Sequence, residues 1–489
     1  MSKCGIKRIL SVLLIFLSVL FFVGSLYVDY TLAGSDLETL LYYSTRSVDA
    51  DWSSLYLGLE ICLPIIVLIT IFMYAIFYDI TFGKIKSKYY PFSFMQKYRK
   101  IIIIILFIFS FIVLIQCIKS IDYIYYSSRK TNFIDNKYVD PKSVDITFPD
   151  NKKNLIVITV ESLEESLFTK KQNGIWDYEV IPELHQLLDE DDTITFNNKK
   201  GMYMLHGTSY TTSSIVANSS ALPIKVNYSR GGYSENNYMS GSYSLGDLLK
   251  KEGYNNEVIS GAATAFGSLD YYYLQHGDYN IIDPDTLSKQ GYKMSKSDEG
   301  KWGFNDNYLF ELAKKRLDVL SEDDRPFNLQ LVTIDTHFVD GFVGDYSTTK
   351  YSRQYENAYA TTSKLIYDFI EYVRSQPYYD NTSIVIVGDH LTMQSDFIND
   401  RMFDDRTMYF CIVDSDLKKH RNDRVYTALD SYPTIVSLLN GKIEGDKLGL
   451  GVDLFSDKKT LAEEYGIKNL DKELRKKSEF YDKIILGER

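Results

Sequence analysis

Three long apolar runs near the N-terminus constrain the fold of this 489-residue chain more than any other feature of its sequence. They cover Ile9–Val28, Ile61–Tyr78 and Ile101–Ile118. At about 1.5 Å of rise per residue, helices of these lengths approach or match a bilayer core about 30 Å thick, so we predict three transmembrane helices. A cleaved signal peptide is the alternative for the first run, because Ala33 and Gly34 are small, and buried core helices are the alternative for the other two.

The charges between these runs predict how they cross the membrane. Basic residues precede the first run and fill the loop between the second and third, namely Lys3, Lys7, Arg8, Lys84, Lys86, Lys88, Lys97, Arg99 and Lys100. Acidic residues occupy the loop between the first and second, namely Asp29, Asp36, Glu38, Asp49 and Asp51. Because Lys and Arg are retained on the cytoplasmic side, the N-terminus is predicted to be cytoplasmic and everything after Ile118 extracytoplasmic.

Charge and cysteine content exclude several classes of protein. The formal net charge of -11, without a basic stripe in the second half, argues against a nucleic-acid binder. Three of the four cysteines lie in or beside the apolar runs, which leaves Cys411 alone in the remainder. A disulfide framework and a thiolate-rich zinc site are therefore both excluded.

The rest of the chain reads as an α/β domain. Short runs rich in Val, Ile and Leu recur between longer stretches, at Leu155–Val160, Asn256–Ser260, Asn328–Ile334, Ser383–Val387 and Tyr409–Val413. Such runs suit central strands that are covered on both faces, so we predict a mostly parallel sheet flanked by helices. We divide the chain into a membrane anchor (1–130), a connector (131–153), an extracytoplasmic domain (154–455) and a charged helical tail (456–489).

Residues with metal-ligand chemistry follow the predicted strands, where parallel sheets gather their functional groups. Glu161 follows the first run, His337 follows the third, and Asp389 with His390 follows the fourth. Glu161, Asp389 and His390 together can hold a divalent cation such as Mn2+ or Zn2+. A solvated or helix-capping Asp-His pair is the alternative.

A run of hydroxyl side chains at 206–214 offers candidate nucleophiles. A hydroxyl bound to a cation has a lowered pKa and can attack a phosphoryl group whose charge the cation also neutralises. Turns and helix caps are the alternative explanation for such a run.

Five sequence blocks, in this order, resemble the sulfatase-like phosphoglycerol transferases. They are Asn154–Glu164, Gly207–Thr211, Trp302–Asp306, Asp335–His337 with Gly341–Phe342, and Asp389–Met393. The resemblance covers roughly residues 150–455 and is stronger to the glucan phosphoglycerol transferase I family than to the lipoteichoic acid synthases.

This resemblance implies an alkaline-phosphatase/sulfatase-like sandwich with one divalent ion, Mn2+ first, with Zn2+ or Mg2+ as alternatives. The implied metal ligands are Glu161, Thr211, Asp389 and His390. Thr211 is the implied nucleophile, because the family's threonine precedes a helix that ends in a segment like Leu222–Pro223, and Thr208 is the alternative. Thr211 would then lie near a helix N-terminus, where backbone N–H groups favour a phosphate.

The resemblance also implies substrate contacts. His337 would bind phosphoryl oxygens or protonate the leaving group, and a structural hydrogen bond is its alternative role. Trp302 and Asp306 would help to form a glycerol pocket, although lipoteichoic acid synthases carry an arginine where this chain has Phe304. His206 is a further candidate for the substrate site because it lies beside the second block, and an ordinary polar contact is its alternative.

The implied activity is transfer of phosphoglycerol from phosphatidylglycerol to a cell-envelope glycan or polyglycerol-phosphate acceptor, at a bacterial plasma membrane and through a phosphothreonine. A phosphoethanolamine transferase, or another sulfatase-fold enzyme acting on phospho- or sulfo-esters, is the first alternative. A classical sulfatase would need a Cys/Ser-x-Pro-x-Arg motif, which this chain lacks. A non-catalytic, glycan-binding envelope protein is the second alternative.

Overall fold

The computed structural model describes residues 3–31, 37–46, 53–78, 90–172, 174–196, 201–226, 232–394, 396–398, 406–416 and 423–487. The chain forms two compact units. The helical unit contains Met1–Leu40 and Ala50–Tyr125, and the α/β unit contains Leu41–Asp49 and Tyr126–Arg489. Residues 41–49 therefore belong to the α/β unit although they lie between two helices of the helical unit in sequence.

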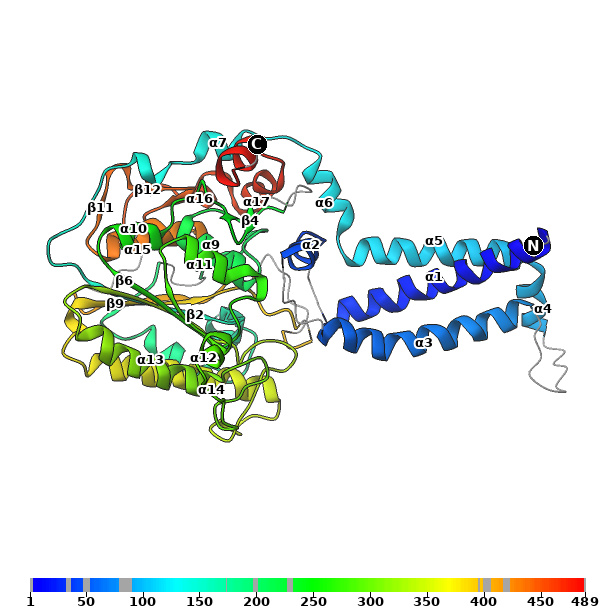
Figure 1. Cartoon of the computed structure of the whole chain (residues 1–489), viewed down its shortest axis with the longest axis horizontal. Helices are drawn as coiled ribbons and strands as arrows, with labels where there is room; N and C mark the ends of the chain where they lie inside the picture. The colour runs from blue at the N-terminus through cyan, green and yellow to red at the C-terminus, as the bar shows by residue number, and fades with distance from the viewer. Residues whose placement is uncertain are drawn as a thin grey trace. The chain divides into compact units, whose positions relative to one another are not determined.

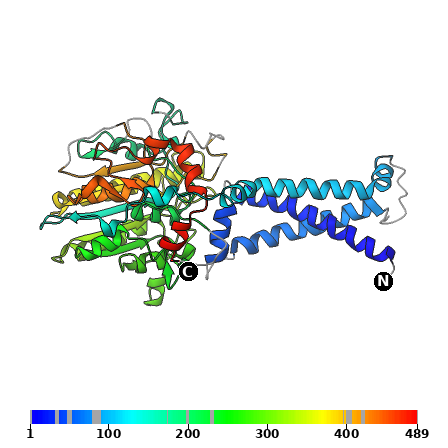
Figure 2. The ribbon, with the colours of Figure 1, turned by 90° about the horizontal axis from the view of Figure 1, so that it is seen from above.

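The helical unit is built on three long helices, α1 (Lys3–Thr31), α3 (Ser53–Tyr78) and α5 (Arg99–Cys117). Helix α1 packs against both α3 and α5 along its length (Figures 1 and 2). Among the described residues, three helical stretches are long and apolar enough to cross a membrane, as predicted: Ile6–Asp29, Glu60–Tyr78 and Arg99–Cys117. Shorter helices of the chain's first part are α2 (Leu37–Arg46), α4 (Tyr90–Lys97) and α6 (Ser120–Ser127).

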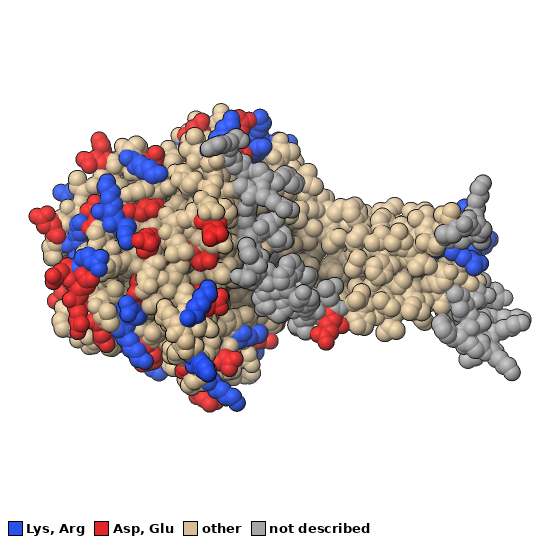
Figure 3. Space-filling view, in the orientation of Figure 1, with Lys and Arg blue, Asp and Glu red and all other residues tan. Residues whose placement is uncertain are grey.

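The outer surface of the helical unit is apolar. Leu68 and Phe72 on α3 are 67% and 65% exposed, and several isoleucines of α5 are also exposed, namely Ile101, Ile104, Ile105, Ile108 and Ile112. Figure 3 shows little charge along the sides of this unit, with Lys and Arg gathered at the end where α1 and α5 begin. A surface of this kind fits a lipid environment better than water.

The main sheet of the α/β unit has, in the described part of the chain, seven strands in the order β3-β10-β9-β2-β8-β6-β7. The parallel strands are β2 (Asn154–Val160), β6 (Asn255–Ser260), β7 (Asn280–Ile282), β8 (Phe327–Val332) and β9 (Thr382–Gly388). At one edge β10 (Phe410–Val413) runs antiparallel to β9, and β3 (Thr193–Ile194) antiparallel to β10. The prediction of a mostly parallel sheet is confirmed, and each of the five predicted runs falls on a strand.

Helices cover both faces of this sheet, which explains why its strands are continuously apolar. Leu155 and Val157 of β2 face one core, whereas Ile156 and Ile158 face the other. The first core is closed by α9 (Thr211–Ser220), α10 (Leu245–Lys251), α11 (Leu269–Gln275) and α15 (Ser431–Leu438), and the second by α8 (Pro182–Leu187), α13 (Asp306–Ser321) and α14 (Gln354–Arg374) (Figure 1). Burying each such aliphatic side chain contributes about 1.5–3 kcal/mol.

Smaller elements complete the α/β unit. Two-stranded pairs join β1 (Ile146–Thr147) to β11 (Lys442–Ile443), β4 (Tyr233–Ser234) to β5 (Asn237–Tyr238), and β12 (Lys447–Leu448) to β13 (Gly451–Val452). The remaining helices of five or more residues are α7 (Phe133–Lys137), α12 (Pro284–Lys289), α16 (Leu461–Tyr465), α17 (Ile467–Arg475) and a turn at Tyr481–Ile485. Leu470 and Leu474 of α17 are buried in the same core as α9, so this part of the tail packs against the domain.

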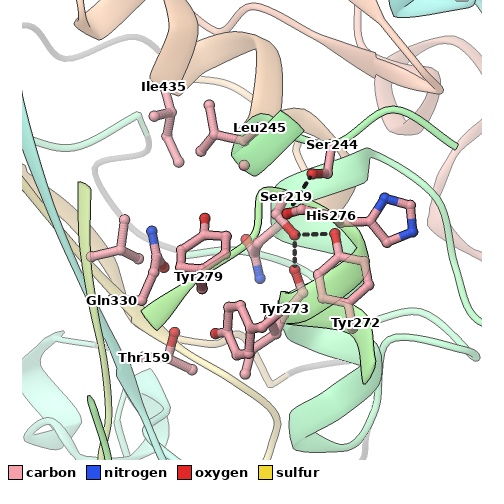
Figure 4. A pocket seen from close by; sticks show the side chains of 14 residues that line it. Thr159, Ser219, Ser244, Leu245, Tyr272, Tyr273, His276, Tyr279, Gln330 and Ile435 are labelled. Atoms are coloured by element: carbon pink, nitrogen blue, oxygen red, sulfur yellow. Dashed lines mark hydrogen bonds between the residues drawn. The ribbon is translucent and has the colours of Figure 1, made fainter. Parts of the chain in front are cut away.

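Part of the tyrosine excess of the chain lies in these cores. Fully buried tyrosines are Tyr42, Tyr233, Tyr238, Tyr254, Tyr272, Tyr355, Tyr359, Tyr409, Tyr426, Tyr432 and Tyr481. Figure 4 shows Tyr272, Tyr273 and Tyr279 around a cavity of about 20 Å³ that residues of α9 also line, and Ser219 Oγ and Tyr272 OH are 2.6 Å apart there. A cavity of this size has room for about one water molecule, so these tyrosines are packing residues.

Candidate active site

Two neighbouring strand ends bring three ionisable groups together. Glu161 follows β2, and Asp389 with His390 follows β9, which lies parallel beside β2. His390 Nε2 is 3.3 Å from Glu161 Oε1 and 3.5 Å from Asp389 Oδ2. One ligand atom from each residue lies within 4.8 Å of the others, and all three side chains are buried.

Thr211 joins this cluster as the first residue of α9. Its Oγ1 lies 3.3 Å from Glu161 Oε2, and the residue is partly exposed, whereas the carboxylates and the imidazole are buried. Thr208 has a different environment. Its hydroxyl is buried, donates to Leu205 O over 2.9 Å and accepts from Leu205 N over 3.1 Å. Thr211 therefore presents its hydroxyl to the cluster, while the Thr208 hydroxyl is used in a turn.

Ser162 holds the two carboxylates in place. Its backbone adopts the left-handed region, with φ of 54°, which a non-glycine residue enters at a cost. In this conformation the Ser162 hydroxyl donates to Glu161 Oε1 over 2.6 Å, and its N–H donates to Asp389 Oδ1 over 2.7 Å. Tyr359 OH donates to Ser162 O over 2.9 Å. The sequence predictions gave Ser162 no role, because only its position after a strand was visible.

The cluster carries an electrostatic conflict. Burial alone would raise the pKa of Glu161, but the interactions with His390 and His337 and the hydrogen bond from Ser162 outweigh it and lower this pKa to about 2. Burial and the neighbouring charge of Glu161 raise the pKa of Asp389 to about 7. Burial disfavours the charged imidazole, yet Asp389 and Glu161 raise the pKa of His390 to about 10. Glu161 and Asp389 therefore both depend on the single positive charge of the His390 imidazolium.

A divalent cation fits this arrangement. Asp389 Oδ2 is buried and receives no hydrogen bond from the part of the chain that the structure describes, although a buried carboxylate oxygen normally has a partner. Two carboxylates, one imidazole and one hydroxyl form a donor set that suits Mn2+, Zn2+ or Mg2+. A cation among them would give Asp389 Oδ2 its missing partner and relieve the repulsion between the carboxylates.

His337 and Trp302 form an aromatic pair beside the cluster. Their ring centroids are 4.6 Å apart, and Lys301 Nζ lies 4.4 Å from the centroid of the Trp302 ring. His337 Nδ1 is 2.6 Å from Phe338 O, and burial lowers the pKa of this histidine. Because Nδ1 donates its proton to a carbonyl, the neutral ring keeps Nε2 as a base or acceptor.

Asp306 supports the loop that carries His337 instead of opening onto a pocket. The side chain is fully buried, and burial raises its pKa to about 6. Its Oδ1 accepts hydrogen bonds from Ile334 N and Asp335 N, and its Oδ2 accepts one from Thr362 Oγ1. The glycerol contact predicted for Asp306 would therefore be indirect, through the backbone that precedes His337.

His206 is engaged by the tail of the chain. Its Nδ1 lies 2.9 Å from Asp471 Oδ2 on α17, and its backbone N–H donates to Asp471 Oδ1 over 2.7 Å. In the described residues the group that can share a metal ion contains Glu161, Asp389 and His390, and His206 is outside it.

A family model described as Sulfatase matches residues 153–441 of the chain, which include the whole cluster. The chain belongs to the sulfatase family. Curated relatives of this sulfatase-family chain include phosphoglycerol transferase I from Escherichia fergusonii, 28% identical over 315 residues. Phosphoglycerol transferase I from Shigella flexneri is 28% identical over 313 residues. Both alignments cover 62% of this chain and 39% of the relative, so the chain matches well under half of the relatives' length.

Solved structures confirm the fold of this sulfatase-family chain. The lipoteichoic acid synthase LtaP from Listeria monocytogenes superposes with a TM-score of 0.51 at 20% identity, covering 66% of this chain and 80% of that one. The lipooligosaccharide phosphoethanolamine transferase A (EptA) from Neisseria meningitidis gives 0.50 at 13% identity, covering 87% and 83%. The predicted alkaline-phosphatase/sulfatase-like fold and the resemblance to phosphoglycerol transferases are both confirmed.

A buried ion pair braces the loop after His390 in this sulfatase-family domain. The Arg406 guanidinium pairs with Glu164 and also donates to Thr392 O over 2.7 Å. Thr392 N in turn donates to Glu164 Oε2 over 3.1 Å. Glu164 lies in a recognised sequence block, but its partner is 242 residues away, so no local pattern could reveal this pair.

Proposed function

We propose that the chain transfers phosphoglycerol from phosphatidylglycerol to a cell-envelope glycan or polyglycerol-phosphate acceptor through a phosphothreonine at Thr211. The observation that carries this proposal is the 3.3 Å separation of Thr211 Oγ1 and Glu161 Oε2, within a cluster completed by Asp389 and His390. A nucleophilic hydroxyl beside a cation-binding set is what a two-step phosphoryl-group transfer requires.

Glu161, Thr211, Asp389 and His390 would hold the divalent cation, with Mn2+ first and Zn2+ or Mg2+ as alternatives. When bound, such a cation lowers the pKa of a coordinated hydroxyl and neutralises charge on phosphoryl oxygens. The hydrogen bonds from Ser162 orient both carboxylates for this role.

In the first step Thr211 Oγ1 attacks the phosphorus of phosphatidylglycerol. The Oγ1–P bond forms, the bond from phosphorus to the diacylglycerol oxygen breaks, and diacylglycerol leaves after taking up one proton. The threonine proton passes to Glu161 Oε2, which lies 3.3 Å from Thr211 Oγ1, and returns to the threonine oxygen in the second step. The N-terminus of α9 directs backbone N–H groups at the phosphate, which stabilises its negative charge.

In the second step a hydroxyl of the acceptor attacks the phosphothreonine. The new P–O bond forms, the bond to Thr211 breaks, and the threonine oxygen recovers a proton. In both steps His337 exchanges a proton with the substituent that leaves or enters at phosphorus. Its Nδ1 is hydrogen-bonded to Phe338 O, so its Nε2 remains for the substrate. For the first step Nε2 must first take up a proton from solvent, which it gives to departing diacylglycerol; the ring is then neutral and takes a proton from the incoming hydroxyl, as microscopic reversibility requires.

The three apolar helices of the helical unit are consistent with a donor lipid that resides in the bilayer. We place the N-terminus in the cytoplasm of a bacterial plasma membrane and the α/β unit outside it, because basic side chains gather at the end of the helical unit where α1 and α5 begin (Figure 3). The sequence of these helix starts contains Lys7, Arg8, Arg99 and Lys100. A phosphoethanolamine transferase is the second candidate, supported by the fold that the chain shares with EptA across 87% of its length.

The test uses the purified full-length chain with Mn2+ and lipids labelled in the diacylglycerol part. Release of diacylglycerol from phosphatidylglycerol, with phosphoglycerol appearing on Thr211 by mass spectrometry, is the expected result. Release from phosphatidylethanolamine alone would favour the second candidate. A protein that binds a glycan but releases diacylglycerol from neither lipid would point to the non-catalytic alternative.

A further inference from the structure

One segment of the α/β unit comes from outside its main stretch of sequence. Residues 41–49 lie between α1 and α3 in the chain but are part of the α/β unit. Tyr42, on α2, is their anchor: it is fully buried, and its hydroxyl lies 2.7 Å from both Tyr238 OH and Gly267 O. Buried tyrosine contacts of this kind fix the position of the segment.

Tyr43 therefore reaches the helix that carries the nucleophile. Its ring centroid is 5.4 Å from that of Tyr210, the residue before Thr211. It also stacks on Phe266, with centroids 4.9 Å apart and planes at 24°.

Gly267 shows how closely Tyr43 packs against the first turn of α9. A Cβ atom at this glycine would lie 3.2 Å from Tyr43 Cε1 and 2.7 Å from Thr212 Oγ1. Gly267 also has φ of 67°, so a side chain there would be strained as well as crowded. The Tyr43 ring thus lies beside the residues that flank Thr211 in sequence.

The outer part of this aromatic pair is open. Phe266 is 48% exposed, and Tyr43 is partly buried, so the two rings lead from the start of α9 to the surface. Burial, together with electrostatic interactions with Tyr42, Glu161 and Asp389, raises the pKa of Tyr43 well above its usual value. Because Tyr43 packs on Tyr210, the residue before Thr211, a substrate held at Thr211 would lie near these rings.

We propose that Tyr43 and Phe266 form an apolar wall that contacts the diacylglycerol part of the lipid donor and so determines its selection. This inference rests on the proposed function. Of the two substituents on the phosphorus of phosphatidylglycerol, the free glycerol needs hydrogen-bond partners, whereas the diacylglycerol offers hydrocarbon and ester groups that suit aromatic faces. The loop between the first two apolar helices thereby supplies a specificity-determining residue to the catalytic unit.

The experiment compares two phosphodiesters that differ in their acyl chains. Full-length wild type, Tyr43→Ala, Tyr43→Phe, Phe266→Ala and Tyr465→Ala are assayed on phosphatidylglycerol in mixed micelles and on water-soluble glycerophosphoglycerol. Tyr465, a partly exposed tyrosine of α16 that packs on Phe133, is the matched control.

We expect Tyr43→Ala and Phe266→Ala each to raise KM for phosphatidylglycerol about tenfold, the effect of removing one partly buried aromatic contact. Their kcat, and their turnover of glycerophosphoglycerol, should stay close to wild type. Tyr43→Phe keeps the ring and should behave as wild type, and so should Tyr465→Ala.

Equal losses on both diesters would overturn the proposal, because they would mean that the rings only hold α9 in place. An increase in KM for the glycan acceptor alone would also overturn it and assign the rings to a sugar. Should wild type release diacylglycerol only from phosphatidylethanolamine, the proposed function fails, and the same comparison made with that lipid and its deacylated form still tests the wall.

Discussion

The backbone N–H of Ser162 donates a 2.7 Å hydrogen bond to Asp389 Oδ1 and thereby joins the ends of β2 and β9. The same residue donates its hydroxyl to Glu161 Oε1, so one serine orients two carboxylates from different strands. Its left-handed backbone makes both bonds possible. Strain of this kind persists where surrounding contacts enforce it, here through Tyr359.

Replacing Ser162 with Ala should weaken metal binding. The variant keeps the N–H bond to Asp389 but loses the hydroxyl bond to Glu161, and loss of such a supporting contact lowers metal affinity about 10- to 100-fold. Titration calorimetry with Mn2+ measures this directly. Ser166→Ala is the control, because the Ser166 hydroxyl is buried and has no hydrogen-bond partner among the described residues. Unchanged Mn2+ affinity in Ser162→Ala would show that Glu161 is oriented by other contacts.

Replacing Thr211 with Ala should abolish diacylglycerol release, by about 10³-fold or more, because the covalent step loses its nucleophile. Thr208→Ala separates this effect from general damage to the loop. It removes a hydrogen bond within the turn and should lower stability by about 1 kcal/mol while leaving turnover close to wild type. Labelled phosphatidylglycerol and urea unfolding give the two readouts. Normal turnover by Thr211→Ala would refute the assignment.

Removing the metal should make stability depend on pH through Asp389. Its folded pKa is raised to about 7, so between the ordinary pKa near 4 and pH 7 the folded protein holds a proton that the unfolded chain has released. The stability of the metal-free protein should therefore fall as pH rises through this window.

This pH dependence is measured by urea unfolding of chelator-treated protein from pH 4 to 8. Asp389→Asn, which cannot ionise, should make the fall shallower, the remainder coming from other raised carboxyls such as Asp306, whose pKa is about 6, and Asp457→Asn at an exposed site should leave the fall unchanged. Saturating Mn2+ should also flatten it in wild type, because the cation favours the charged carboxylate. A metal-free wild type whose stability rises over this range would contradict the electrostatic conflict described for the cluster.

Sequence patterns predicted the strand ends but not the contacts between them. Glu161, Asp389 and His390 could be placed because parallel strands deliver the residues after them to one edge of the sheet. The roles of Ser162 and Asp306 depend on a backbone angle and on side-chain orientation, which residue spacing does not encode. The packing role of Tyr42 could not be predicted for another reason. Its partners Tyr238 and Gly267 lie about 200 residues later, and nothing near Tyr42 in sequence indicates them. The short antiparallel edge strand β3 has only two residues, too few for any periodicity.

Breaking the ion pair between Glu164 and Arg406 should destabilise the α/β unit more than removing both charges. Arg406→Met leaves the Glu164 carboxylate buried and unpaired, at a cost of about 3–5 kcal/mol, whereas Arg406→Met with Glu164→Leu leaves neither charge. Because Thr392 N donates to Glu164 and Thr392 O accepts from Arg406, either change should also loosen the loop that follows His390. Chemical unfolding of the single and double variants, with Arg353→Met at an exposed pair as the control, measures the difference. A double variant less stable than Arg406→Met would contradict this expectation, because it would mean that an unpaired Glu164 carboxylate costs less than the loss of both side chains.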